Sequence, residues 1–261
     1  MATDQKSIYI FHIFRKDGNS LFLHPFSSVD KIVGQLENTA VIGRYGLEPR
    51  VEALTAFRNE LYRQIEHGVK RWLSEARFVP KFIIAAVGFV LVYFFMSYVI
   101  PDPIPVIDEV AVGLAVAIGI YFLQGRRDMS SKMAAKKRLE LRIGVDKIVF
   151  RESDFVKQVE TALHRKETEQ FDEVVRQIVE PVSQDLGDAF RSEADQFIRL
   201  LEDRFHFKSF KKKEKIFERY LGGSEERFQD LKRILEAKKL DFPMYAVYKS
   251  FKKTVSKPKR G

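Results

Sequence analysis

One pair of side chains in this sequence has a spacing that could bind a metal ion. Glu160 and His164 lie four residues apart, so a helix would place a carboxylate and an imidazole on one face. Two ligands do not make a metal site, and two basic residues follow the histidine. We therefore interpret the pair as an ordinary solvated pair on a helix surface, and we expect no metal site.

A second acidic group lies between two apolar runs. Asp102, Asp108 and Glu109 could attract a divalent cation, because carboxylate oxygens are the ligands that such ions prefer. The same acids are equally typical of a loop on the non-cytoplasmic side of a membrane. We favour the second interpretation, so these residues carry no predicted metal either.

The sequence patterns of several large enzyme classes are absent. The chain has no glycine-rich phosphate loop, no dinucleotide-binding glycine pattern, no zinc-protease helix motif and no nucleophile elbow. It also has no cysteine, which excludes disulfides, thiolate catalysis and cysteine-based metal sites. We accordingly predict no catalytic residues, no cofactor and a non-enzymatic protein.

Positive charge is concentrated near the C-terminus. The whole chain has a formal net charge of +9, and residues 206–261 contain 17 basic and 7 acidic residues. Such an excess predicts an anionic partner. We expect anionic lipid headgroups, contacted by Arg126, Arg127, Lys136, Lys137, Lys211, Lys212, Lys213, Lys252 and Lys253. Nucleic acid is not expected, because no nucleic-acid-binding module is recognisable. Alternatively, the aromatic residues around 207–221 pack onto the helices while the lysines face water.

Two apolar runs occupy the middle of the chain. Phe82–Ile100 contains 19 residues without a charge, and as a helix it would extend about 28 Å, close to the thickness of a bilayer core. Val110–Leu123 contains only 14 uncharged residues, but it lengthens if its helix begins earlier. We predict spans at about 82–100 and 106–123, with an outside loop at 101–109.

The flanking charges predict the orientation of these spans. Basic residues precede the first run and follow the second, whereas Phe82–Leu123 has no Lys or Arg. The positive-inside rule then gives a multi-pass cell-membrane protein with two crossings and both termini in the cytoplasm. Two alternatives remain, namely a helical hairpin buried in a soluble core and a shallow hairpin that enters and leaves the same leaflet.

Three small residues recur every four positions in the second run. Ala111, Ala115 and Gly119 would form one face of a helix, which allows close approach of another helix in a membrane. We predict that this helix-packing face meets the first span near Ala85 and Gly88. A second copy of the chain is the alternative partner, which would make the protein a homo-oligomer.

The flanking segments predict two cytosolic modules, and together these patterns predict a mainly α membrane protein. Residues 1–78 contain a β-hairpin around an Asp-Gly turn and then a long amphipathic helix, which indicates a small α+β module. A transmembrane hairpin follows at 79–125. Residues 126–242 have apolar positions three and four apart, typical of a helical or coiled-coil-like module, which Pro181 should divide. Residues 243–261 are expected to form a basic flexible tail.

The expected function follows from this layout. We expect a membrane anchor or scaffold whose helical module mediates association with an unknown protein partner or self-assembly, with the polybasic region held at the inner leaflet. One alternative is a component of an oligomeric channel or transporter, although the spans have almost no polar residues to line a pore. The other is a membrane-bound enzyme with an unrecognised cytosolic site.

Overall fold

The protein is mostly helical, with one small sheet. The computed structural model describes residues 7–26, 29–99, 106–182, 190–207, 217, 229–230, 233 and 240–256. Two compact units are present. The first comprises residues 1–27, 39–58 and 148–261, and the second comprises residues 28–38 and 59–147. Most of the predicted outside loop and Lys211, Lys212 and Lys213 lie outside the described residues.

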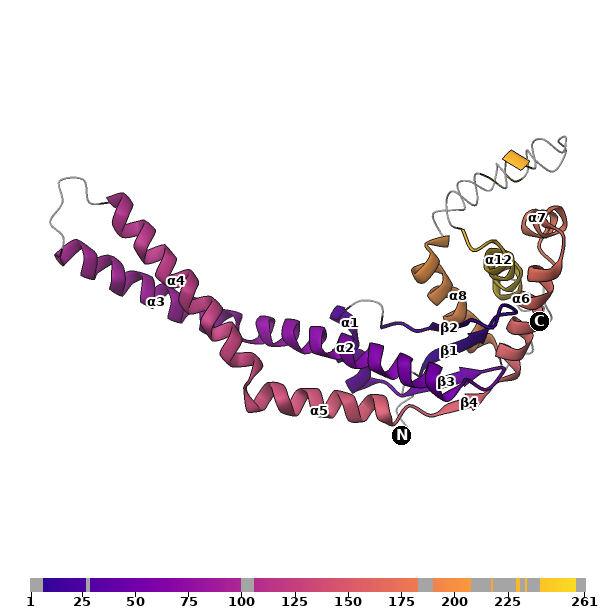
Figure 1. The fold of residues 1–261 in the computed structure, drawn as a ribbon, viewed down its shortest axis with the longest axis horizontal. Coiled ribbons are helices and arrows are strands. Elements are labelled where there is room, and N and C mark those ends of the chain that lie inside the picture. The colour runs from indigo at the N-terminus through magenta and orange to yellow at the C-terminus, as the bar shows by residue number, and fades with distance from the viewer. Residues whose placement is uncertain are drawn as a thin grey trace. The chain divides into compact units, whose positions relative to one another are not determined.

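The first unit contains a four-stranded sheet with the order β2-β1-β3-β4 (Figure 1). Its strands are β1 (Ile8–Phe14), β2 (Ser20–Leu23), β3 (Val41–Tyr45) and β4 (Phe150–Glu152). The predicted β-hairpin is confirmed, because β1 and β2 pair antiparallel with Phe14 opposite Ser20. Gly18 adopts a φ of 83° in the turn, a conformation that favours glycine.

Strands β3 and β4 are neighbours that lie far apart in the sequence. They pair in parallel, with Gly43 opposite Phe150, and parallel strands require a crossover connection. Here the crossover contains the four helices α2 to α5, including both apolar runs. The division into separate modules at 1–78 and 126–242 is therefore wrong, since one compact unit contains strands from both. The three residues of β4 are too few for their periodicity to predict a strand.

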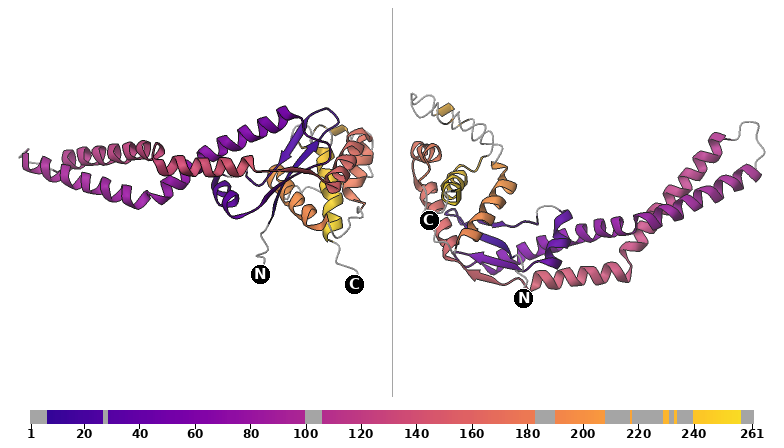
Figure 2. Two further views of the ribbon diagram at one scale, coloured as in Figure 1. Left: turned by 90° about the horizontal axis from the view of Figure 1, so that it is seen from below. Right: turned by 180° about the vertical axis from the view of Figure 1, so that it is seen from behind.

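Four described helices complete the first unit. They are α6 (Asp154–Thr168), α7 (Phe171–Val179), α8 (Arg191–Phe205) and α12 (Phe242–Ser256). Helices α6 and α8 contact β1, and α12 contacts α6, α7 and α8 (Figure 2). Helix α7 ends just before Pro181, as predicted. The predicted amphipathic helices are therefore present, whereas a coiled-coil arrangement is not confirmed by these contacts.

Aromatic side chains form the centre of this core. The rings of Phe11, Phe155, Phe197 and Phe251 are fully buried and meet edge to face, with centroid distances of 5.6 to 6.2 Å. Such edge-to-face pairs stabilise a core beyond the burial of their area. Residues from β1, α6, α8 and α12 thus meet in a single cluster.

The prediction of a flexible tail from residue 243 is wrong for its first part. Phe242–Ser256 forms helix α12, and Tyr245 and Phe251 have no exposed surface. Five consecutive residues, Met244–Tyr248, are buried, so the first half of this helix is covered on most sides although the helix contains three lysines. Charge content alone was a poor guide here, because the lysines fall only from the middle of the helix onward, at positions that are not fully buried.

Gly43 lies in the middle of the sheet, where β4 approaches it most closely. A Cβ atom at this position would overlap the ring of Phe150, which packs edge to face on Phe57 at 6.3 Å. We expect Gly43→Ala to lower the free energy of unfolding of this unit by about 1–3 kcal/mol, the usual cost of overpacking. Hydrogen exchange of the β3 amides in the detergent-solubilised full chain measures the effect.

As a control, Phe150→Leu shortens the side chain opposite position 43 and makes room for the methyl group of Gly43→Ala. Phe150→Leu alone costs stability through a smaller side chain, but Gly43→Ala/Phe150→Leu should cost less than the two single changes added together. Strict additivity of the two changes would show that the ring of Phe150 does not cause the strain.

The second unit is helical. It contains α1 (Val29–Asn38), most of α2 (Val51–Ala76), α3 (Phe78–Val99), α4 (Val106–Met129) and α5 (Lys132–Asp146). Helices α3 and α4 lie side by side along their length, and α1 contacts α5 (Figures 1 and 2). The break between α2 and α3 falls at Arg77, so Pro80 lies in the first turn of α3. A proline is tolerated there because its missing N–H has no partner within the helix.

Candidate membrane hairpin and its charged base

Helices α3 and α4 are long and apolar enough to cross a membrane. The candidate spans are Phe78–Val99 and Asp108–Met129. Many of their large apolar side chains are not covered by the partner helix, and more than half of the surface of each is exposed in Phe82, Leu91, Phe94, Phe95, Leu114, Phe122 and Leu123. Exposed apolar surface of this extent marks a site of contact with lipid or protein. Helix α4 begins at Val106, so Asp108 and Glu109 lie in its first turn, where the helix dipole favours acids.

The two helices meet along a narrow seam of small residues. Ala85 is buried, and a Cβ atom on Gly88 would lie 2.5 Å from Cδ1 of Ile120. A Cβ atom on Gly113 would lie 3.0 Å from the ring of Phe89. Glycine at these two positions thus allows the backbones to approach closely, as in many helix pairs within membranes. Gly88 was correctly predicted as a contact on the first helix, and the predicted Ala85 is buried.

The face predicted for the second helix does not meet the first helix, so that part of the prediction is wrong, and its alternative partner, a second copy of the chain, stays a prediction. Ala111 and Ala115 are exposed, and a Cβ atom on Gly119 would meet nothing within 4 Å. The residues of α4 that meet α3 include Gly113 and Ile120 instead. A regular spacing of small residues defines a face of a helix, but it does not say which neighbour that face meets. That depends on how the helix is rotated about its axis, which the pairing with α3 determines.

A cluster of charged groups joins the two helices at the end from which α2 and α5 continue. Nζ of Lys81 lies 2.9 Å from Oδ2 of Asp128, and Nη1 of Arg77 donates to Oδ1 of the same carboxylate at 2.5 Å. Lys81 and Asp128 are both only 6% exposed. Asp128 is thus held between two cations, one from α3 and one immediately before it. Sequence reasoning missed this cluster, although opposite charges next to the two apolar runs were a signal for it.

The turn from α4 to α5 is ordered by side-chain contacts. Ser131 is the N-cap of α5, and its Oγ accepts from the amide of Ala134 at 3.3 Å. The guanidinium of Arg138 donates to the carbonyl of Met129 at 2.9 Å and pairs with Glu66 at 2.8 Å. These contacts determine the direction in which α5 leaves the end of α4.

The residues predicted to contact anionic lipid are in different situations. Arg126, Arg127 and Lys136 are exposed around this turn, and Lys253 is exposed on α12. Lys137 pairs with Glu37, and its Nζ lies 5.2 Å from the ring centre of Trp72. Lys252 pairs with Glu202 at 2.7 Å. Lys137 and Lys252 therefore hold the protein together, and their charges are already compensated.

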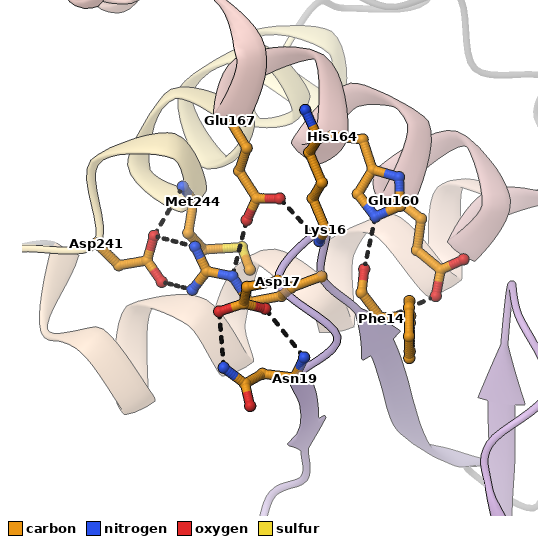
Figure 3. A network of polar contacts seen from close by, with 10 residues as sticks. Phe14, Lys16, Asp17, Asn19, Glu160, His164, Glu167, Asp241 and Met244 are labelled. Carbon is orange, nitrogen blue, oxygen red and sulfur yellow. Dashed lines mark hydrogen bonds and ion pairs between the residues drawn. The ribbon is translucent and has the colours of Figure 1, made fainter.

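A second polar network, in the first unit, attaches the β-hairpin to two helices (Figure 3). The guanidinium of Arg15 donates to Oε1 of Glu167 at 2.8 Å and to Oδ2 of Asp241 at 2.5 Å. Oδ1 of Asp241 also accepts from the amide of Met244 at 3.2 Å, at the start of α12. Burial works against the charge of Arg15, but the carboxylates of Asp241 and Glu167 outweigh it and raise the pKa of Arg15.

Glu160 and His164 belong to the same region and bond one residue of β1 (Figure 3). Oε1 of Glu160 accepts from the amide of Phe14 at 2.9 Å, and Nε2 of His164 lies 3.1 Å from the carbonyl of Phe14. Glu160 is 7% exposed, so its interpretation as a solvated side chain is wrong. Burial raises the pKa of Glu160, opposed by backbone amides. Both groups are engaged in fastening α6 to the end of β1.

The polar network of the first unit has no groups arranged for metal binding within the described residues. The network around Arg15, Glu160 and His164 bonds the backbone and other side chains, which suits a structural role. Within the described ranges no group of three or more His, Asp or Glu side chains could hold a metal ion. Comparison with protein families, with curated proteins and with solved structures finds no match for this chain.

Proposed function

We propose that this protein is a two-span membrane protein that holds an α/β unit at the cytoplasmic face, where the unit associates with another protein or a second copy of the chain. The observation that carries the proposal is the exposure of large apolar side chains around α3 and α4. In water this surface would be unfavourable by about 25 cal/mol per Å², whereas lipid chains would cover it.

The charges at the ends of the helix pair support the orientation. Exposed Arg126 and Arg127 follow the apolar part of α4, and exposed Lys70 precedes α3 in the chain. The described part of the helix pair has acids and no basic residue at the opposite end, where α4 begins. Under the positive-inside rule this arrangement favours a cytoplasmic position for the end that bears Arg126.

The insertion of the helix pair between β3 and β4 supports the anchoring role. Both ends of the candidate hairpin lead, through α2 and α5, to strands of one sheet, so the unit would be attached to the membrane by two connections. We propose that this attachment presents the α/β unit at the membrane surface for association. Crosslinking in native membranes should capture a specific partner or a second copy, and recovery of uncrosslinked monomer alone would contradict the association.

The absence of cysteine makes the topology directly testable. Single cysteines are introduced as Asp102→Cys and Ser256→Cys, and intact cells are treated with a membrane-impermeant maleimide. We expect labelling at position 102 in intact cells and at position 256 only after permeabilisation. Ser130→Cys, beside the exposed arginines of α4, is the matched control and should behave like position 256.

Each other outcome has a definite meaning. Labelling at positions 130 and 256 but not at 102 would invert the topology. Equal protection of all three positions would favour a hairpin that does not cross the bilayer. Extraction of the unmodified chain from membranes by alkaline carbonate would contradict the membrane anchor itself.

A further inference from the structure

We infer that four cations at the start of the cytoplasmic segment, Arg126, Arg127, Lys132 and Lys136, bind the phosphates of anionic phospholipid headgroups. This inference deepens the proposed function and rests on it, because it needs the α3–α4 pair to lie in a bilayer. All four side chains are exposed, and none makes an ion pair within the residues that the structure describes. We call this set the exit cations.

The acids nearest the exit cations are engaged with other bases, and Glu140, four residues after Lys136, lies 3.9 Å from Nζ of Lys137. Asp128, the nearest acid in the sequence, is paired with Lys81 and Arg77. Glu66 pairs with Arg138 and with Arg142. The second unit therefore separates its basic residues into a paired group, which holds the helices together, and an unpaired group beside the apolar surface.

The exit cations lie on either side of the ordered turn between α4 and α5. Arg126 and Arg127 lie in the last turn of α4, and Lys132 and Lys136 lie one turn apart at the start of α5. Ser131 caps α5, and Arg138 bonds the carbonyl of Met129, so the two pairs are joined by a defined turn. Four cations that are unpaired within the described residues thus lie between positions 126 and 136, directly after the apolar part of α4, and this position favours a lipid headgroup as their ligand.

Anionic lipid is the ligand that this position and charge favour. Guanidinium groups bind phosphate oxygens through two parallel hydrogen bonds, and lysine contributes a point charge. Each Lys or Arg near an anionic bilayer surface strengthens the binding of the protein to that surface about fivefold. The exit cations directly follow the exposed apolar surface of α4. The phosphate groups within their reach are therefore those of lipids in the surrounding membrane.

The single tryptophan of the chain provides the test, because Trp72 lies in the same unit. The full-length protein is placed in nanodiscs of phosphatidylcholine with a trace of lipid that carries an energy acceptor on its acyl chain. The acceptor lipid has either a phosphatidylserine or a phosphatidylcholine headgroup. We expect energy transfer from Trp72 to report at least a fivefold local enrichment of phosphatidylserine, which high salt should reduce.

Two charge-matched variants decide whether the exit cations cause this enrichment. Arg126→Gln/Arg127→Gln/Lys132→Gln/Lys136→Gln should lower the enrichment to near unity. Arg50→Gln/Arg151→Gln/Arg199→Gln/Arg204→Gln removes the same charge from exposed arginines of the first unit and should leave it unchanged. Equal enrichment in the two variants, or none in the unmodified protein, would overturn the inference. Failure of the unmodified chain to enter the nanodiscs would instead refute the proposed membrane anchor, and the inference with it.

Discussion

Asp128→Ala is expected to destabilise the pairing of α3 with α4 by about 3 kcal/mol. The change leaves the ammonium of Lys81, 6% exposed and 2.9 Å from the lost carboxylate, without its partner. Removing one member of a buried ion pair typically costs 3–5 kcal/mol. We expect the lower end of that range, because Lys81 lies in the first turn of α3 and its stem can bend toward the interface.

The measurement follows separation of the two helices in mixed micelles as denaturing detergent is added. Since the chain has no cysteine, labels can be attached through Leu91→Cys and Leu114→Cys, and energy transfer between them reports pairing. Both positions are more than half exposed, so the labels do not occupy the seam.

Two further variants separate the ion pair from a general effect of charge. Lys81→Met/Asp128→Leu removes both buried charges and should restore the pairing to within about 1 kcal/mol of the unmodified protein. Asp108→Ala removes an exposed acid of the same helix and should cost less than about 1 kcal/mol, the scale of a helix-dipole interaction. An Asp128→Ala variant as stable as Asp108→Ala would show that the cluster does not hold the helices together.

The stability of the first unit is expected to fall by about 3 kcal/mol as the pH is lowered from 6.5 to about 4, owing to His12. This residue of β1 is 1% exposed, and its ring lies 4.8 Å from that of Phe22. Burial lowers the pKa of His12 from 6.5 to about 4, opposed by the backbone of Leu47. Over this pH range the unfolded chain binds a proton that the folded chain does not.

The contribution of His12 to the stability of the folded state decreases as the pH falls. A base whose pKa is depressed by folding stabilises the folded state fully above pH 6.5, and this contribution is lost toward pH 4. The raised pKa of Glu160 has the opposite sign, because the folded state takes up that proton more readily. The contribution of His12 must therefore be isolated by comparison with a variant.

Hydrogen exchange of the β1 amides, corrected for intrinsic rates and measured between pH 4 and 7, gives the required stabilities. His12→Leu removes the titrating group and should reduce the dependence on pH over this range, with the other acids and bases unchanged. A parallel dependence on pH in the unmodified protein and in His12→Leu would exclude His12 as the cause.

Local patterns predicted several elements of this fold correctly. The alternation of bulky residues around the Asp-Gly turn predicted the β1–β2 hairpin, and the repeat of apolar residues predicted α2. The uncharged run Phe82–Ile100 predicted α3 and its C-terminal end, whereas the helix begins one turn earlier, at Phe78. Each of these signals is local, because strand alternation, helical periodicity and a proline act within a few residues.

Contacts between distant residues could not be predicted in this way. Strand β4 has three residues, and its pairing with β3 connects segments about a hundred positions apart. The lysines of α12 suggested a solvated tail, yet the helix is buried because its aromatic face has a matching surface on α6 and α8. The helical spacing of Glu160 predicted a surface position, but the residue is buried because the end of β1 lies beside it.

For this protein, then, the sequence by itself determined most of the long helices, which segments are apolar enough to enter a membrane, and where positive charge accumulates. Only the tertiary structure decided which of those charges are compensated. Lys81 and Asp128 are 47 positions apart in the sequence and meet at 2.9 Å, whereas Arg126 and Arg127 remain exposed. A net charge calculated from the composition gives every charged residue the same weight. The free energy of each charge, however, depends on its distance from a partner and on its access to water.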